Sequence, residues 1–288
     1  MRGIVRLACL AAGLLASQPA SAAPVADAAT LAAVKACAPA QPCAAKLPVR
    51  VVVVTMFEIG KDTGDAPGEF QLWKERRHLT ETIAFPQGWH DLAYDPETGV
   101  LAVVTGMGSI KSATAALALG LDERLDLSKA YWLVAGIAGI DPEDASVGSA
   151  AWARYLVDGD MAHEIDAREI PAGWTSGYFA LHSKGPMDKT PLEPANGELF
   201  ELNSALRDWA FALTKDMALP DDPRIAEARG AFTGYPNAQK PPFVLKGDNL
   251  AAMTFWHGAK LTQWANDWTR FWTRGKGEFV TSAMEETG

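Results

Sequence analysis

The fold of this chain is decided by residues 105–160, TGMGSIKSATAALALGLDERLDLSKAYWLVAGIAGIDPEDASVGSAAWARYLVDGD. The apolar run LAVV just before this stretch is short enough for a buried strand, and it stops at a turn that contains Gly106 and Gly108. Small and apolar residues at helical spacing follow over 109–121. A second strand, AYWLVAGIAG, then ends in Gly136 and Gly139, and a third begins after Val147. The pattern predicts an α/β protein whose strand ends meet in a crevice that suits a small ligand.

The glycine turn at 106–108 opens directly onto the N-terminus of the predicted helix. Free backbone N–H groups and the helix dipole favour an anion or hydroxyl groups there, so Gly106, Gly108 and Ser109 are candidate phosphate or anion ligands. A dinucleotide fingerprint would require a third glycine where Lys111 stands, and an acidic residue at the end of the next strand. Dinucleotide binding is therefore not expected.

Several ordered phrases resemble one known family. They are MFE at 56–58, LDLSKAYWLVAGIAG from 125, ARY from 153, IDAREIPAGWTSGY from 165, ELNSALRDWA from 201 and FWHG from 255. Together they resemble the purine nucleoside permease family of the nucleoside phosphorylase superfamily. The resemblance implies one domain over 48–288, with a phosphorylase-like mixed central sheet flanked by helices.

The resemblance also implies roles for individual residues. Met284 and Glu285 match the Met-Glu pair that phosphorylase relatives place under the ribose, where a carboxylate accepts from two hydroxyls. Phe255 and Trp256 match the position of the aromatic residue that stacks on the purine, and Gly136 and Gly139 would line the same pocket. Glu58 lies where the catalytic nucleophile is oriented in these relatives. A solvated loop carboxylate remains an equal alternative for Glu58.

The chain departs from the family pattern at two places. Family members continue past this point with a helix, a strand, and an Asp or Asn beside the purine N7, whereas this sequence ends at Gly288. The C-terminal helix and strand are therefore expected to be missing, together with the group that would help the base to leave. Met253 stands where relatives often carry an Asp, two places before the aromatic residue.

Composition excludes some classes of partner and cofactor. The 288 residues are 48% hydrophobic and carry a net charge of -9, which argues against a nucleic-acid partner. Asp158, Asp160 and His163 cluster after a predicted strand, but their spacing matches no zinc pattern, and solvated turn residues are the expected outcome. No metal or cofactor is expected, although phosphate is possible as a co-substrate.

The N-terminal segment has the features of an export signal. Residues 1–23 combine a basic start, a short apolar run and small residues in A-x-A order, and predict a periplasmic or secreted protein with no membrane span after cleavage. Residues 24–47 form an Ala- and Pro-rich leader. In an oxidising compartment Cys37 and Cys43 are expected to form a small disulfide loop rather than two free thiols.

The remaining pattern predicts the other elements. A strand is expected at the four valines that precede Thr55, and 198–217 is predicted as an amphipathic helix whose apolar positions, Trp209 among them, are structural. Further strands are expected at FVLK from 243 and FVTSA from 279, with a helix after Gly258. Residues 79–94 are expected to be irregular, and the Gly- and Pro-rich segment 167–197 to be a long excursion over the site.

Three functions remain open from the sequence. The first is a periplasmic purine-nucleoside-binding protein of the permease family, implicated in uptake and possible as an oligomer. The second is an enzyme that breaks the N-glycosidic bond with phosphate or water. The third is an inactive truncated domain.

Overall fold

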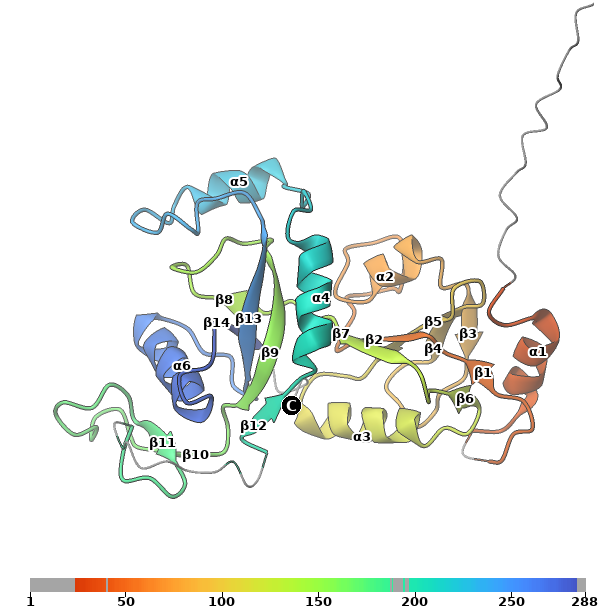
Figure 1. Ribbon diagram of the computed structural model, residues 1–288, viewed down its shortest axis with the longest axis horizontal. Helices are drawn as coiled ribbons and strands as arrows, with labels where there is room; N and C mark the ends of the chain where they lie inside the picture. Colours follow the sequence, from red (N-terminus) through yellow and green to blue (C-terminus); the bar gives the residue numbers. More distant parts are fainter. Residues whose placement is uncertain (1–23, 40, 187, 189–193, 195–196, 284–288) are drawn as a thin grey trace, which may run out of the picture.

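The computed structural model describes residues 24–39, 41–186, 188, 194 and 197–283, and it confirms a mixed α/β architecture (Figure 1). Hydrogen bonding divides most of the strands into two mixed five-stranded sheets, with the orders β3-β4-β5-β2-β7 and β12-β9-β13-β14-β8. The two sheets lie on either side of helix α4, Ser204–Thr214 (Figure 1). The predicted central sheet is thus built as two neighbouring sheets.

The first sheet is built on the valine run. β2 (Val51–Thr55) pairs in parallel with β5 (Val100–Val104) on one side and with β7 (Tyr131–Val134) on the other. Val52, Val53 and Val54 are all buried because apolar clusters cover both faces of this strand. The antiparallel strands β4 (Leu92–Asp95) and β3 (Glu81–Ile83) complete the sheet. The expectation of an irregular segment over 79–94 is wrong, since Leu92 and Tyr94 are fully buried in these strands.

The second sheet is centred on β13 (Val244–Ala251), which pairs in parallel with β9 (Ala150–Asp158) and β14 (Phe279–Ala283). β12 (Leu199–Glu201) and β8 (Gly139–Ile140) close its two edges in antiparallel orientation. β13 runs on through the Gly-Asp-Asn sequence, where the strand FVLK was predicted to end. Asp248 explains this continuation. The pairing register between β13 and β9 shifts at a β-bulge that contains Asp248. The buried carboxylate of Asp248 accepts from the N–H groups of Tyr155 and Glu278.

The helices follow the predicted apolar spacing. α3 (Ser109–Gly120) covers the first sheet, and α6 (Ala259–Trp272) buries three of its tryptophans against the second. The smaller helices are α1 (Ala28–Ala36), α2 (Gln71–Arg76) and α5 (Pro223–Arg229). Two short strand pairs remain, β1 (Leu47–Pro48) with β6 (Leu125–Asp126) and β10 (Ala162–Glu164) with β11 (Tyr178–Ala180).

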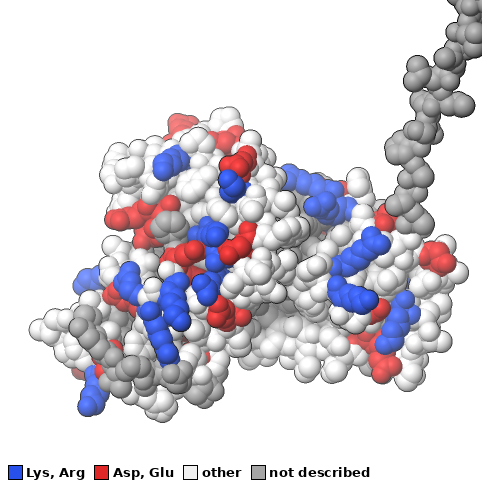
Figure 2. Space-filling view, viewed as in Figure 1, with Lys and Arg blue, Asp and Glu red and all other residues white. Residues whose placement is uncertain are grey.

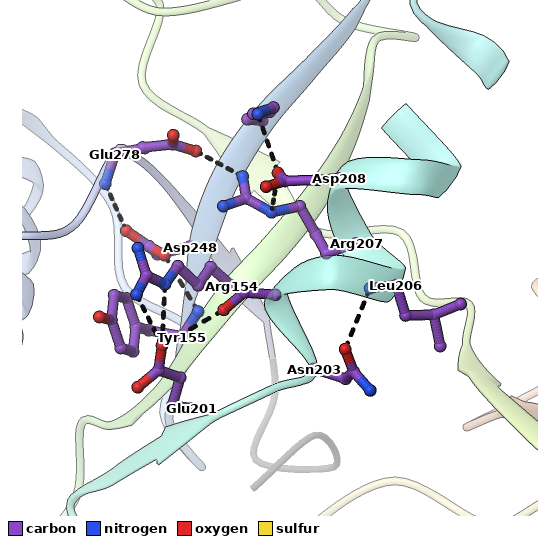
Figure 3. Close-up of polar contacts among 11 residues, drawn as sticks. Arg154, Tyr155, Glu201, Asn203, Leu206, Arg207, Asp208, Asp248 and Glu278 are labelled. Atoms are coloured by element: carbon purple, nitrogen blue, oxygen red, sulfur yellow. Dashed lines mark hydrogen bonds and ion pairs between the residues drawn. The ribbon is translucent and has the colours of Figure 1, made fainter. Parts of the chain in front are cut away.

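Helix α4 packs with its charged side inward. Arg207 is buried and pairs with Glu278 at 2.7 Å and with Asp208 at 3.2 Å, while Leu206 points to the other side of the helix (Figure 3). On the apolar side, Trp209 is 61% exposed and Leu213 63% exposed. The expectation that Trp209 has a structural role in the core is therefore wrong. The amphipathic pattern identifies two faces of the helix, but the second sheet offers carboxylates and Lys246 rather than an apolar surface.

Cys37 and Cys43 form a disulfide directly after α1. The bond closes a short loop in the leader that precedes β1. Asp27 caps the N-terminus of the same helix by accepting from the N–H of Thr30 at 2.7 Å. The described residues of the leader thus pack against the first sheet, since Val34 and Leu47 are fully buried in its core.

Candidate functional site

The glycine turn after β5 lies at the carboxyl end of the first sheet. Gly106 and Gly108 have φ angles of 84° and 94°, a region that side chains with a Cβ rarely adopt. Two hydroxyl groups hold the turn: that of Ser112 donates to the carbonyl oxygens of Gly106 and Gly108, and that of Thr105 donates to the carbonyl oxygen of Gly106. α3 then begins at Ser109 without a side-chain cap of its own. The predicted anion-binding turn therefore has the expected backbone form.

Met253, which follows β13 of the second sheet, contacts this turn. The main-chain N–H of Ser109 donates to the Met253 sulfur at 3.3 Å, and the Ser109 hydroxyl lies 3.5 Å from the same atom. A Cβ at Gly108 would come within 3.0 Å of the Met253 methyl carbon. The N–H of Met253 in turn donates to Asp160 at 2.8 Å. The glycine turn and the segment that contains Phe255 are thus brought together across the two sheets.

The two aromatic residues predicted to hold a purine differ in their surroundings. Phe255 is 69% exposed, two residues beyond the contact with the turn. Trp256 packs edge-on against Trp264, with ring centroids 5.5 Å apart, and belongs to the margin of the α6 core. A flat face that is free for stacking is therefore offered by Phe255, whereas Trp256 has a structural role in the core.

Glu69 ties together two strand ends and was not identified from the sequence. Its buried carboxylate accepts from the N–H of Met56, just after β2, at 2.8 Å and from the N–H of Ile137, just after β7, at 3.1 Å. Burial raises the pKa of Glu69, and the neighbouring Glu58 raises it further, against the lowering effect of the N–H donors. No local motif predicts this role, because the three residues lie far apart along the chain.

Glu58 is the residue predicted to be catalytic, and its carboxylate organises a loop. It accepts from the N–H groups of Ile59 at 2.7 Å, Phe70 at 2.9 Å and Gln71 at 2.5 Å, and also from that of Gly68. Burial raises the pKa of Glu58, but the four N–H donors outweigh it and the pKa lies below its ordinary value. The carboxylate is thus held in its ionised form by the loop that returns to α2.

The two predicted purine-lining glycines follow β7 in different positions. Gly136 packs against Met56 and Glu69, where a Cβ would approach the Met56 methyl carbon to 2.6 Å. Gly139 begins β8 and pairs with Ser282 of β14. Met284 and Glu285, the predicted ribose ligands, follow β14 in sequence and lie outside the described residues.

A basic and an aromatic residue flank the glycine turn. The Lys111 ammonium lies 3.7 Å from the ring centroid of Trp89, and a Cβ at Gly106 would come within 2.9 Å of the Lys111 side chain and 3.3 Å of the Trp89 ring. Lys111 stands where a dinucleotide fingerprint would have glycine, and its positive charge lies over the Trp89 ring. Trp89, which is 56% exposed, was not among the predicted site residues.

Two further findings concern the described part of the chain as a whole. Its His, Cys, Asp and Glu residues form no group of three or more that is arranged to hold a metal ion. Its helices include none that is both long and apolar enough to cross a membrane.

Comparisons with known proteins agree with the resemblance. The family model described as purine nucleoside permease (NUP) matches residues 48–288. A probable purine nucleoside permease of Schizosaccharomyces pombe is 29% identical over 194 residues, which cover 65% of this chain and 56% of that protein. A purine nucleoside permease of Candida albicans is 26% identical over 246 residues, covering 82% of this chain and 57% of the relative. The chain thus spans somewhat more than half the length of these relatives.

The solved structures that align with this chain are distant in sequence. A 5'-methylthioadenosine/S-adenosylhomocysteine nucleosidase of Helicobacter pylori aligns with a TM-score of 0.48 at 12% identity, covering 84% of this chain and 78% of that one. A futalosine hydrolase mutant of the same species aligns with a TM-score of 0.41 at 12% identity, covering 81% and 87%. The family is shown by the sequence match, which extends over most of the chain. This chain belongs to the purine nucleoside permease family.

Proposed function

We propose that this protein binds purine nucleosides in the region where the glycine turn of 106–109, the ends of β2 and β7, and the segment around Phe255 converge. The observation that carries the proposal is the contact between Ser109 and Met253. It brings an N–H-lined turn to within two residues of an exposed aromatic ring, and a nucleoside needs both kinds of surface.

Each part of a nucleoside has a matching group in this region. The exposed ring of Phe255 suits the flat base, because base–aromatic stacking contributes about 1–3 kcal/mol. The turn and Lys111 suit hydroxyl or phosphate oxygens. Glu285 is proposed for the ribose hydroxyls on the strength of the resemblance, and it follows the strand β14, whose Ser282 pairs with Gly139.

Binding is favoured over cleavage by the state of Glu58. A general base needs a free lone pair and a pKa near the working pH. The Glu58 carboxylate is engaged by four backbone N–H groups, and its pKa lies below its ordinary value. This carboxylate is therefore a weak proton acceptor that has little freedom to turn toward a water. Phosphorolysis or hydrolysis is the second candidate function, and the experiment below includes it.

The binding protein is proposed to act outside the cytoplasmic membrane, in the periplasm or as a secreted protein. The export signal predicted over 1–23 and the disulfide between Cys37 and Cys43 support an oxidising compartment. In that compartment, the protein would capture nucleosides and support their uptake.

Isothermal titration calorimetry with inosine, adenosine and guanosine tests the proposal, with cytidine as the non-purine comparison. We expect saturable binding of at least one purine nucleoside and a loss of about tenfold or more in affinity for Phe255→Ala. The matched control is Phe232→Ala, which truncates a partly exposed phenylalanine elsewhere, and should leave the affinity unchanged. Absence of binding by all three purine nucleosides would overturn the proposal.

Chromatography of inosine incubated with the protein, with and without phosphate, separates binding from catalysis. A binding protein leaves inosine intact in both samples. Release of hypoxanthine that depends on the protein would establish the enzyme instead, and its dependence on phosphate would distinguish phosphorolysis from hydrolysis.

A further inference from the structure

The turn that follows β9 is bonded to the end of β13. The two strands run side by side in parallel, and their last paired residues are Asp158 and Ala251 (Figure 1). Beyond that pair, the N–H of Gly159 donates to the carbonyl oxygen of Ala251 at 2.7 Å. The indole N–H of Trp268 on α6 donates to the carbonyl oxygen of Asp158, also at 2.7 Å. The start of the turn is thus fixed to both β13 and α6.

Asp158 and Asp160 have different roles within this turn. The Asp158 carboxylate accepts from the N–H groups of Asp160 at 2.6 Å and Met161 at 3.2 Å, so its role is local. The Asp160 carboxylate reaches out of the turn instead, and accepts from the N–H of Met253 at 2.8 Å. A side chain thereby continues the connection between the ends of β9 and β13 past the last backbone pair.

Phe255 lies in a segment that has few other anchors. In the part of the chain that the structure describes, residues 254–257 take part in no hydrogen bond. Trp256 is held by its edge-on packing against Trp264. The exposed ring of Phe255 therefore lies between two anchors, which are the Asp160 hydrogen bond on one side and the packing of Trp256 on the other.

We propose that Asp160 is a positioning residue of the nucleoside site. Its hydrogen bond to the N–H of Met253 sets the distance between the segment that contains Phe255 and the glycine turn. The inference rests on the function proposed above. It explains how the Met253 side chain can leave the N–H of Ser109 when a ligand enters, since Asp160 and not the turn holds the main chain of Met253. A segment that is ordered in advance loses less conformational freedom on binding, and its affinity is correspondingly higher.

Two substitutions separate the hydrogen bond of Asp160 from its charge. Asp160→Asn keeps an oxygen that can accept from the N–H of Met253, whereas Asp160→Ala removes it. In calorimetric titration with the purine nucleosides, we expect Asp160→Ala to lower the affinity by about three- to tenfold, and Asp160→Asn by less than about twofold.

A matched control measures the effect of charge alone. Acidic and basic side chains are interspersed over the second sheet on the face shown in Figure 2, and exposed charges are screened over about 8 Å at physiological salt. Asp216→Ala removes the same charge from a side chain that is 86% exposed, and should leave the affinity unchanged. Circular dichroism verifies that all three variants are folded.

Hydrogen exchange in the ligand-free protein tests the inference without a nucleoside. In Asp160→Ala, the N–H groups of Met253 and Ser109 should both exchange faster by about threefold or more, because the segment and its thioether move away from the turn. Asp160→Asn should exchange like the unmodified protein at both positions. If the unmodified protein binds no purine nucleoside, the proposed function fails, and the exchange rates alone decide whether Asp160 positions the segment. Unchanged exchange at Ser109 in Asp160→Ala, unchanged affinity in that variant, or equal losses in the alanine and asparagine variants would each overturn the inference.

Discussion

The main-chain N–H of Ser109 donates to the sulfur of Met253 at 3.3 Å, and this contact joins helix α3 on the first sheet to the segment that follows β13, the central strand of the second. A thioether is a weak acceptor, so the N-terminus of α3 is covered without being neutralised. Ligand oxygens are stronger acceptors than sulfur, and an incoming ligand would replace Met253 at a small cost.

The first prediction concerns Met253. Met253→Leu keeps the volume and removes the acceptor, and it should change the free energy of unfolding by less than about 1 kcal/mol in urea titration. Met253→Asp places a carboxylate at the helix N-terminus and should stabilise α3 by about 0.3–1 kcal/mol relative to the leucine variant. The same carboxylate would occupy the N–H groups of the turn, so nucleoside affinity should fall in Met253→Asp and not in Met253→Leu. Equal affinities for the two variants would show that the turn does not contact the ligand.

The second prediction concerns Glu69 and Glu58, which hold different backbone segments near the proposed site. In Glu69→Gln the amide can accept only one of the two N–H groups, so the ends of β2 and β7 lose one of their ties. We expect a loss of about 1–3 kcal/mol in the free energy of unfolding, because a buried N–H is left without an acceptor. Glu58→Gln should weaken the hydrogen bonds that hold the loop before α2. It should leave the hydrogen bond from the N–H of Ile137 to Glu69 intact. Hydrogen exchange at Ile137 distinguishes the two, since only Glu69→Gln should speed it.

The third prediction concerns the pH dependence of stability at Asp144. Burial, together with the neighbouring Asp141 and Glu143, raises the pKa of Asp144 to about 6. A raised pKa means that the folded state holds the proton more tightly than the unfolded state. The stabilisation is therefore complete below about pH 3.8 and is lost as the pH rises through about 6. Asp144→Asn should accordingly stabilise the protein at pH 7, by about 1 kcal/mol after allowing for solvent screening, and have little effect at pH 4. Urea titrations at both pH values test this, and an equal effect at both would exclude the titration of Asp144 as the cause.

The fourth prediction compares two Asp-x-Arg pairs with the same spacing and different burial. Arg124 is fully buried and bonds to Asp122 and to the carbonyl oxygen of Ala84, whereas Arg168 is exposed beside Asp166. Arg124→Ala should cost about 3–5 kcal/mol because it leaves a buried carboxylate without its partner. Arg168→Ala should leave the thermal stability nearly unchanged, since exposed pairs contribute little. Similar losses in thermal unfolding would contradict the role of burial.

The fifth prediction concerns the inverted orientation of α4. Arg207→Ala should destabilise the protein by about 2 kcal/mol or more, because Glu278 loses its partner beside the buried Asp248. Trp209→Ala should change the stability by less than about 0.5 kcal/mol, although tryptophan is the larger side chain. The reverse order in urea titration would show that the apolar face of α4 is covered in solution.

Local patterns were sufficient to predict the strands at 51–55 and 100–104, the helix at 109–120 and the helix after Gly258, because apolar periodicity and glycine turns act over a few residues. They also sufficed to place the positive φ angles at Gly106 and Gly108 in a tight turn. The family is likewise evident from ordered phrases along the chain. These features depend on residues that are close together in the sequence, so the sequence is sufficient to predict them.

Other features depend on residues that are distant in sequence and were decided only by the tertiary structure. The pairing of β3 with β4, the division into two sheets and the inward turn of the charged face of α4 follow from which surfaces each element meets. The same holds for the site, where Glu69 joins Met56 to Ile137 and Met253 covers Ser109. The sequence by itself determined where strands and turns form, whereas the buried carboxylate and the thioether gained their roles only when folding brought distant backbone N–H groups to them and removed the water that would otherwise have bound those groups.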